Sequence, residues 1–215
     1  MKTIYEFLLK SKTAASTQDL DYIDLGLPSG LLWASCNIGA KEPTDCGDYF
    51  MWGSTEPNTN DKCNWAHAPF NNGYALYNAK YFESIKNKVC PNGILAPEYD
   101  AATAILGDEW RLPTADEFKE LIDNTNHEWI ENYKDSKING MIFTTKTNDA
   151  ELFIPASGLR GESITVNKGQ CGYLWSSSLF TSSKDYARYF IFNDSYCSMR
   201  YGKHYYGFCL RAVKE

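Results

Sequence analysis

The segment from residue 172 to residue 213 constrains the fold of this chain most, because an apolar frame there encloses a polar, aromatic insert. The frame consists of residues 173–178 at one end and residues 207–213 at the other. Between them, residues 179–206 hold six of the chain's 15 tyrosines, together with serines and phenylalanines. Tyrosine gives a large, stiff contact with a polar tip, and serine gives adaptable hydrogen bonds at a small entropic cost. The insert therefore has the composition of a recognition surface. An aromatic-rich antiparallel sheet with tyrosines on its wet face is the alternative interpretation.

Alternation within the insert indicates which side chains face outward. Phe190 and Phe192 share one parity, while Tyr189 and Ile191 share the other, as on a strand whose side chains alternate between two faces. We expect one parity to face the core and the other, with Tyr189 and Ile191, to face solvent.

A turn at residues 193–195 separates this strand from the next. After it, Cys197 and Met199 are the inward candidates, and the outward ones are Tyr196, Ser198 and Arg200. Gly202 with Lys203 predicts a second turn before Tyr205.

Length and composition are those of a single globular domain. The chain has 215 residues, with 43% hydrophobic, 22% charged and 15% aromatic residues and a mean hydropathy of −0.45. No stretch approaches the ~20 apolar residues of a membrane span. The net charge of −6 and the pI near 5.2 argue against a nucleic-acid partner. Within the insert, four basic residues outnumber two acidic ones, which favours an acidic or polar partner.

The N-terminal residues 1–21 read as a short helix and a linker ahead of a domain at residues 22–215. Ile4, Phe7 and Leu8 fall at helical spacing, and residues 12–21 are polar. The apolar run needed for a secretory signal is missing. The helix from Met1 to Lys12 would fold back on the domain or attach the chain to a fibre or a homo-oligomer. A virion-associated or otherwise exported location suits these features.

Seven cysteines at wide, unequal spacings argue against both a zinc site and a disulfide framework. The chain has no Cys-x-x-Cys pair, and an odd number would leave one thiol over. We expect the cysteines to be reduced and mainly buried. We expect the protein to bind no metal and no cofactor.

The first half of the chain predicts strands and turns. Residues 22–33 form two short apolar runs around a Pro-Ser-Gly turn, which predicts a hairpin. Residues 48–53 predict a short aromatic strand, and residues 54–73 predict a long loop rich in Asn and Pro.

Two helices and a further hairpin follow. Pro97 and Gly107 delimit an alanine-rich helix at residues 99–106. Thr114 and Glu117 predict a capping box at the start of a second helix, whose buried stripe comprises Phe118, Leu121 and Ile122. Residues 141–146 and 151–154 flank a turn and predict a hairpin. The fold class is therefore α+β.

Several of these motifs together resemble a large group of paralogous gut-bacterial domains. The shared motifs lie at residues 24–34, 47–53, 100–103, 110–114, 175–178 and 210–211, and the resemblance covers about residues 22–213. That group is similar to the formylglycine-generating-enzyme branch of the C-type-lectin fold, and it includes ligand-binding proteins diversified by retroelements. The resemblance implies a C-type-lectin-like domain with two helices packed on short antiparallel sheets.

The resemblance also implies that the chain from residue 175 onward builds the ligand-facing sheet. Positions that would face a protein or glycan ligand on a cell surface are Phe180, Thr181, Ser183, Asp185, Tyr189, Ile191, Asp194, Ser195, Tyr196, Ser198, Arg200, Tyr201, Lys203, His204, Tyr205 and Tyr206.

Enzymatic alternatives have weaker support in the sequence. A formylglycine-generating oxidase needs two closely spaced thiols, whereas Cys197 and Cys209 stand twelve residues apart. The sequence contains no Gly-x-Ser-x-Gly elbow, and this argues against a serine hydrolase. A structural subunit of a phage fibre or surface assembly is a further alternative.

Calcium-dependent sugar binding has one motif in its favour. Residues 56–58, Glu-Pro-Asn, copy a tripeptide of calcium-binding C-type lectins, but the partner motif at residues 192–194 lies about 135 residues away. Calcium needs six to eight converging oxygens. We therefore expect a metal-free, non-enzymatic binding domain, with glycan binding through stacked tyrosines left open.

Overall fold

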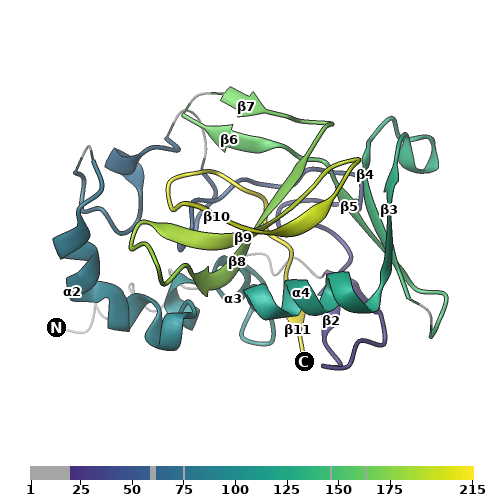
Figure 1. Ribbon diagram of the computed structural model, residues 1–215, viewed down its shortest axis with the longest axis horizontal. Helices are drawn as coiled ribbons and strands as arrows, with labels where there is room; N and C mark the ends of the chain where they lie inside the picture. The colour runs from purple at the N-terminus through teal and green to yellow at the C-terminus, as the bar shows by residue number, and fades with distance from the viewer. Residues whose placement is uncertain (1–19, 59–61, 75, 146, 163) are drawn as a thin grey trace, which may run out of the picture.

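Three α-helices and four small antiparallel sheets make up the part of the chain that the structure describes. The computed structural model describes residues 20–58, 62–74, 76–145, 147–162 and 164–215 (Figure 1). Its helices are α2 (Ala79–Val89), α3 (Ala101–Leu106) and α4 (Ala115–Asn124). The predicted α+β class is confirmed.

Eleven short strands build these sheets. The first sheet has the order β1-β2-β11 and the second the order β10-β9-β8. The third has the order β3-β4-β5, and β6 pairs with β7 alone. Their bounds are β1 Tyr22–Asp24, β2 Leu32–Ala34, β3 Asn126–Ile130, β4 Gly140–Thr144, β5 Glu151–Pro155, β6 Leu159–Gly161, β7 Ile164–Val166, β8 Gly172–Leu179, β9 Tyr186–Phe192, β10 Cys197–Lys203 and β11 Val213–Lys214.

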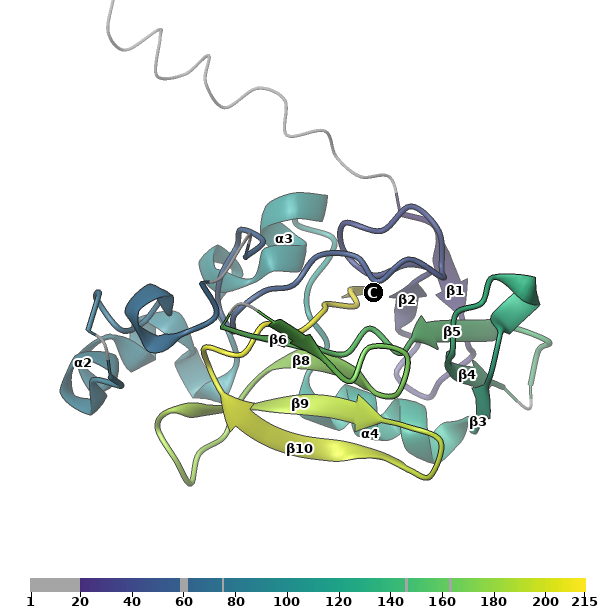
Figure 2. The ribbon, with the colours of Figure 1, turned by 90° about the horizontal axis from the view of Figure 1, so that it is seen from above.

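The sheet β10-β9-β8 lies between two hydrophobic clusters. On one face, Phe190 stacks on Phe118 of α4 with ring centroids 5.1 Å apart. On the other face, Ile191 and Trp175 belong to a second cluster. Figure 2 shows α4 behind the sheet and β10 as its outer strand. The edge strand β10 and the two ends of this sheet are therefore its most exposed parts, and in β9 the side chains of Tyr186, Arg188 and Tyr189 are half-buried.

The apolar frame around the insert is anchored by a fully buried arginine. Arg211 donates to the carbonyl oxygens of Ala34 (2.9 Å), Ser35 (2.8 Å) and Phe153 (3.2 Å) and to Oδ1 of Asn37 (3.0 Å). Burial lowers the pKa of its guanidinium to about 10, so it stays charged at neutral pH. One side chain thus ties the end of the chain to β2 and β5.

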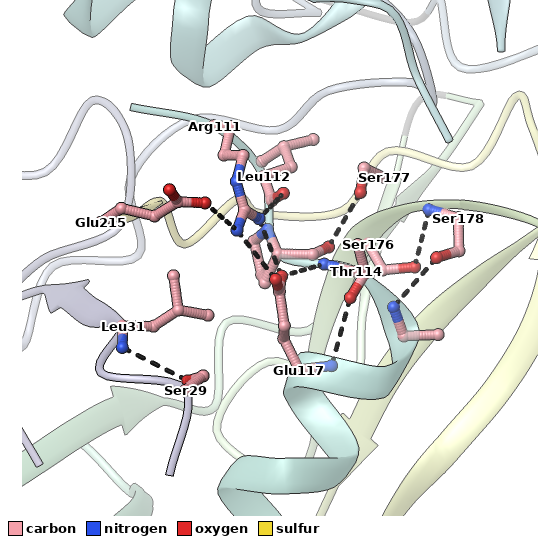
Figure 3. A network of polar contacts seen from close by, with 12 residues as sticks. Ser29, Leu31, Arg111, Leu112, Thr114, Glu117, Ser176, Ser177, Ser178 and Glu215 are labelled. Atoms are coloured by element: carbon pink, nitrogen blue, oxygen red, sulfur yellow. Dashed lines mark hydrogen bonds and ion pairs between the residues drawn. The ribbon is translucent and has the colours of Figure 1, made fainter. Parts of the chain in front are cut away.

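The serines of residues 176–178 also hold the frame together. Ser178 Oγ accepts from the backbone N of Ala115 at the start of α4 (3.0 Å), and Ser177 Oγ donates to the carbonyl of Pro113 (3.3 Å; Figure 3). Ser176 Oγ donates to the carbonyl of Arg188 in β9 (2.8 Å). These hydrogen bonds join the sheet to the start of α4, so the three serine hydroxyls stabilise the fold.

The capping box of α4 is confirmed, as Figure 3 shows. Thr114 Oγ1 accepts from the backbone N of Glu117 (3.2 Å), and the Glu117 carboxylate accepts from the backbone N of Thr114 (2.7 Å). Arg111 makes a two-pronged contact with the same carboxylate, 2.8 Å at each nitrogen. Burial acts to raise the pKa of Glu117, but these hydrogen bonds outweigh it and lower the pKa overall.

Other local predictions have mixed outcomes. The hairpin at residues 22–33 is confirmed by the pairing of Tyr22 with Ala34, and the hairpin at residues 141–154 by β4 and β5. The strand predicted at residues 48–53 is wrong, because only Phe50 makes a bridge, to Phe208. The chain then turns, and Trp52 packs beneath the insert.

The helices differ from the prediction in number and in one boundary. The α-helix predicted at residues 99–106 begins at Ala101, because Asp100 caps it by accepting from the backbone N of Ala102 (2.8 Å). Helix α2 was not predicted. It buries Phe82 and Val89, and Asn78 caps it. The helix predicted at residues 1–12 lies outside the described residues.

We expect Arg211→Met to destabilise the fold by about 3–5 kcal/mol, because the substitution leaves several buried carbonyl oxygens without a donor. Urea unfolding followed by circular dichroism measures the loss. Arg200→Met, at an exposed position of β10, is the matched control and should change stability by no more than about 0.5 kcal/mol. Equal unfolding midpoints for the two variants would contradict a stabilising role for the hydrogen bonds of Arg211.

Candidate ligand-binding surface

The sixteen predicted ligand-binding residues lie on the β9–β10 hairpin and the segments that flank it. The exposed ones are Thr181, Asp194, Ser195, Tyr196, Arg200 and Tyr201. The half-buried ones are Phe180, Ser183, Asp185, Tyr189, Ser198, Lys203, Tyr205 and Tyr206. The last two, Ile191 and His204, are buried.

The outward placement of Ile191 and His204 is wrong. Ile191 is 7% exposed, because hydrophobic clusters cover both faces of the central strand β9. Alternating side chains at this end of the strand therefore point into one cluster or the other, and not into solvent. The second turn was also misplaced. Gly202 and Lys203 belong to β10, and the chain turns at His204 and Tyr205. This turn places the His204 ring against Trp52, with centroids 4.6 Å apart.

The predicted residues do not share one face. Cys197 and Met199 pack against the cluster of α4, as expected, and Ser198 and Arg200 lie on the other side of the strand. Tyr201 follows Arg200 directly, so it returns to the side of Met199. The hairpin therefore presents two separate surfaces.

The first surface is a row of half-buried rings, Tyr189, Tyr206, Tyr205, Trp65 and Tyr77, which we call the aromatic row. Tyr205 lies 4.8 Å from both Tyr206 and Trp65, and Trp65 lies 5.1 Å from Tyr77, between ring centroids. Tyr189 and Tyr206 both pack on buried Phe208, at 4.8 and 5.9 Å. The row thus rests on the core.

Gly202 leaves room for the first two rings of the row, Tyr189 and Tyr206. A Cβ atom at Gly202 would lie 3.0 Å from Tyr189 and 3.5 Å from Tyr206. Arg200, the register partner of Tyr189, and exposed Tyr196 lie beside these rings on the same side of β10. Burial raises the pKa values of Tyr189 and Tyr205 to about 12, so both hydroxyls remain neutral donors at neutral pH.

The second surface is a small cluster of Phe180, Tyr186, Arg188 and Tyr201. Phe180 and Tyr201 stack with centroids 4.1 Å apart and an interplanar angle of 7°. Tyr186 meets Tyr201 edge-on at 5.6 Å, and the guanidinium carbon of Arg188 lies 5.4 Å from the Phe180 ring. These side chains satisfy one another in stacking and cation–π contacts.

Two members of the aromatic row were not predicted from the sequence. Trp65 and Tyr77 come from the loop before α2, which shares no motif with the insert. Tyr77 also donates to the carbonyl of Lys184 (2.5 Å), and Lys184 pairs with Glu83 of α2 (2.8 Å). Aromatic residues in a polar loop were the available signal, but their partner was not visible from local sequence.

The two cysteines considered as catalytic candidates are weak nucleophiles in this environment. Cys209 is fully buried, and burial raises the pKa of its thiol to about 12. Burial also raises the pKa of half-buried Cys197. Both therefore carry a proton near neutral pH, whereas the thiolate is the reactive form.

The tripeptide at residues 56–58 has a role within its own loop. Oδ1 of Asn58 accepts from the backbone N of Met51 (2.7 Å), and its carbonyl accepts from Arg160 (3.1 Å). Within the described ranges, no three His, Cys, Asp or Glu side chains are grouped so as to hold a metal ion.

Comparison with family models, with curated proteins and with solved structures finds no match for this chain. None of the helices in the described part of the chain is long and apolar enough to cross a membrane.

We expect acid to destabilise the fold through His204. Burial lowers the pKa of His204 from its ordinary 6.5 to about 3, and Nε2 has no partner among the described residues. Below pH ~6.5 the unfolded chain binds a proton at this ring that the folded chain does not. Stability therefore falls by up to ~1.4 kcal/mol per pH unit as the pH drops toward the folded value.

Urea unfolding of His204→Leu and of the parent chain across this pH range measures the effect. As the pH falls, the free energy of unfolding should decrease less steeply in His204→Leu than in the exposed control His67→Leu. Identical slopes in the two variants would refute the assignment.

Proposed function

We propose that this protein is a non-enzymatic, receptor-binding or adhesin-like protein, which holds a protein or glycan ligand against the aromatic row and the adjacent Tyr196 and Arg200. The observation that carries the proposal is the aromatic row itself. Its rings stay partly open to solvent although they pack on the core, so little side-chain freedom is lost when a ligand binds. Tyrosine, tryptophan and arginine are the side chains that most often dominate binding energy.

The proposal includes a C-type-lectin-like fold of the formylglycine-generating-enzyme branch. What supports it is where the shared motifs lie. Trp33, Trp52, Trp175, Phe50 and Arg211 come from those motifs and are all fully buried. The large side chains of these motifs thus lie in the core, whereas Thr181, Asp194, Ser195, Tyr196, Arg200 and Tyr201 between residues 179 and 206 are exposed.

We also propose that the exposed positions of the insert tolerate diversification, as in the retroelement-diversified members of that group. Thr181, Asp194, Ser195, Tyr196 and Arg200 reach solvent, and substitutions at such positions usually change stability by only about 0.5 kcal/mol. A near-copy of the corresponding DNA beside a reverse-transcriptase gene would support this part of the proposal.

The oxidase alternative has little support in the geometry. Cys209 lies in the closing frame segment and Cys197 on β10, and both belong to the packed cluster around α4. A nucleophilic or metal-binding thiolate needs an environment that lowers its pKa, whereas burial raises it at both positions.

We expect Tyr196→Ser combined with Arg200→Ser to reduce ligand capture by about tenfold or more, because central aromatic and arginine residues each contribute on the order of 2 kcal/mol to binding. The measurement is retention of the fluorescently labelled full-length chain on intact bacterial cells and on a glycan array. Tyr22→Ser combined with Lys119→Ser, at exposed positions outside the hairpin and the aromatic row, is the matched control.

Light scattering on the same variants separates binding from assembly. A structural subunit predicts that the Tyr196 and Arg200 substitutions change the mass in solution and leave capture unaffected. That outcome would replace the binding proposal.

We expect Cys197→Ser combined with Cys209→Ala to retain ligand capture, at a stability cost of roughly 1–2 kcal/mol from the altered core. Capture is measured as above, and stability by urea unfolding. A folded double variant that loses capture completely would favour thiol chemistry.

A further inference from the structure

A polar hollow lies at the turn end of the β9–β10 hairpin. Its volume is about 430 Å³, within the range of small-molecule sites. Three segments far apart in the sequence line it: the β3–β4 hairpin with Trp129, Glu131 and Asn139, the loop with Gln170, and the β9–β10 turn with Asn193 and Asp194.

Two asparagines hold the walls of the hollow in place. Oδ1 of Asn193 accepts from the backbone N atoms of Ser195 (2.9 Å) and Tyr196 (3.0 Å). Asn139 accepts from the backbone N of Asn132 (3.1 Å) and donates to the carbonyl of Gly169 (3.2 Å). Both loops are therefore fixed before any ligand arrives, which lowers the entropic cost of binding.

The groups that remain for a ligand include both donors and acceptors. Nδ2 of Asn193, the Gln170 amide and the Trp129 indole N–H have no partner among the described residues. The Glu131 carboxylate is likewise unengaged there, and Asp194 uses only Oδ1, toward Ser195 Oγ (2.9 Å). Hydroxyl groups both donate and accept, so this set matches a polyhydroxylated ligand.

The charge of the lining narrows the ligand class. Glu131 and Asp194 lie in the hollow, and none of its lining residues is a Lys or Arg, which disfavours anions. A cationic ligand would use the carboxylates but would cover the amide and indole donors without pairing them, which costs free energy for each donor that it shields from water. A neutral sugar uses both sets, and the half-buried Trp129 offers a ring against its apolar face.

We infer that this hollow binds a neutral saccharide unit, through the Trp129 ring, the Glu131 and Asp194 carboxylates and the amides of Gln170 and Asn193. The assignment rests on the proposed function, because Tyr196 comes two residues after Asp194 of the hollow and lies beside Tyr189 of the aromatic row. It names the ligand class: a glycan with a neutral unit in the hollow and its continuation along Tyr196.

The test is an NMR titration of the full-length chain with methyl α-mannoside, methyl β-galactoside, N-acetylglucosamine and cellobiose. Choline and N-acetylneuraminic acid are the cationic and anionic comparators. The indole N–H signal of Trp129 is assigned by its loss in Trp129→Leu. At least one neutral saccharide should shift that signal saturably, and neither comparator should.

Glu131→Ala combined with Asp194→Ala should weaken that saccharide by about tenfold, because the exposed carboxylates supply its main acceptors. Glu128→Ala, on the same strand but of opposite parity to Trp129, is the matched control and should change the affinity by less than about twofold. Circular dichroism verifies that each variant is folded.

Three results would overturn the inference: no saturable shift with any neutral saccharide, a shift with choline instead, or an unchanged affinity in the double variant. Cell capture that still depends on Tyr196 and Arg200 alongside any of these would leave the proposed function standing and reject the saccharide site alone.

Discussion

The buried guanidinium of Arg211 is the contact on which the rest of the structure depends. A charge can remain in a protein interior only if hydrogen bonds replace its hydration, and four uncharged oxygens do so here. Those oxygens belong to β2, the segment after it and β5. The closing segment of the chain must therefore meet these elements in one arrangement, and this fixes one end of the insert at residues 179–206.

The other end of the insert is fixed by the serines that follow Trp175. Their hydrogen bonds reach α4, β9 and the segment before α4, and the pairing of β8 with β9 shifts register across them. With both ends fixed, the hairpin between them is supported on two faces by separate hydrophobic clusters. A hairpin supported in this way can vary at its edge and its ends at little cost to stability, which suits a binding surface.

The chemistry of the surface is also consistent with recognition. The phenols of Tyr189 and Tyr205 are neutral over the physiological range, and the thiols of Cys197 and Cys209 are protonated. The groups presented to solvent are therefore hydrogen-bonding and stacking groups with stable protonation states. Binding through such a surface, as proposed, should vary little with pH until protonation at His204 begins to favour the unfolded chain.

The sequence by itself determined the features that depend on residues close together along the chain. The capping box of Thr114 and Glu117 spans four residues, and the β4–β5 hairpin needs only two apolar runs and a turn, so both were predicted correctly. Helix α2 carried a comparable signal in Phe82, Val89 and the cap at Asn78, and its omission was an error of interpretation. The fold-family assignment stays a proposal.

Only the tertiary structure decided which alternating residues meet solvent. Alternation divides β9 into two sides but cannot say that a second core cluster covers the side of Ile191. It likewise could not place Trp65 beside Tyr205 and Tyr77 beside Trp65, or bring Trp129 to the hairpin turn. The physical reason is that burial and long-range contact are properties of packed surfaces, whereas periodicity specifies only the direction of a side chain relative to its own strand.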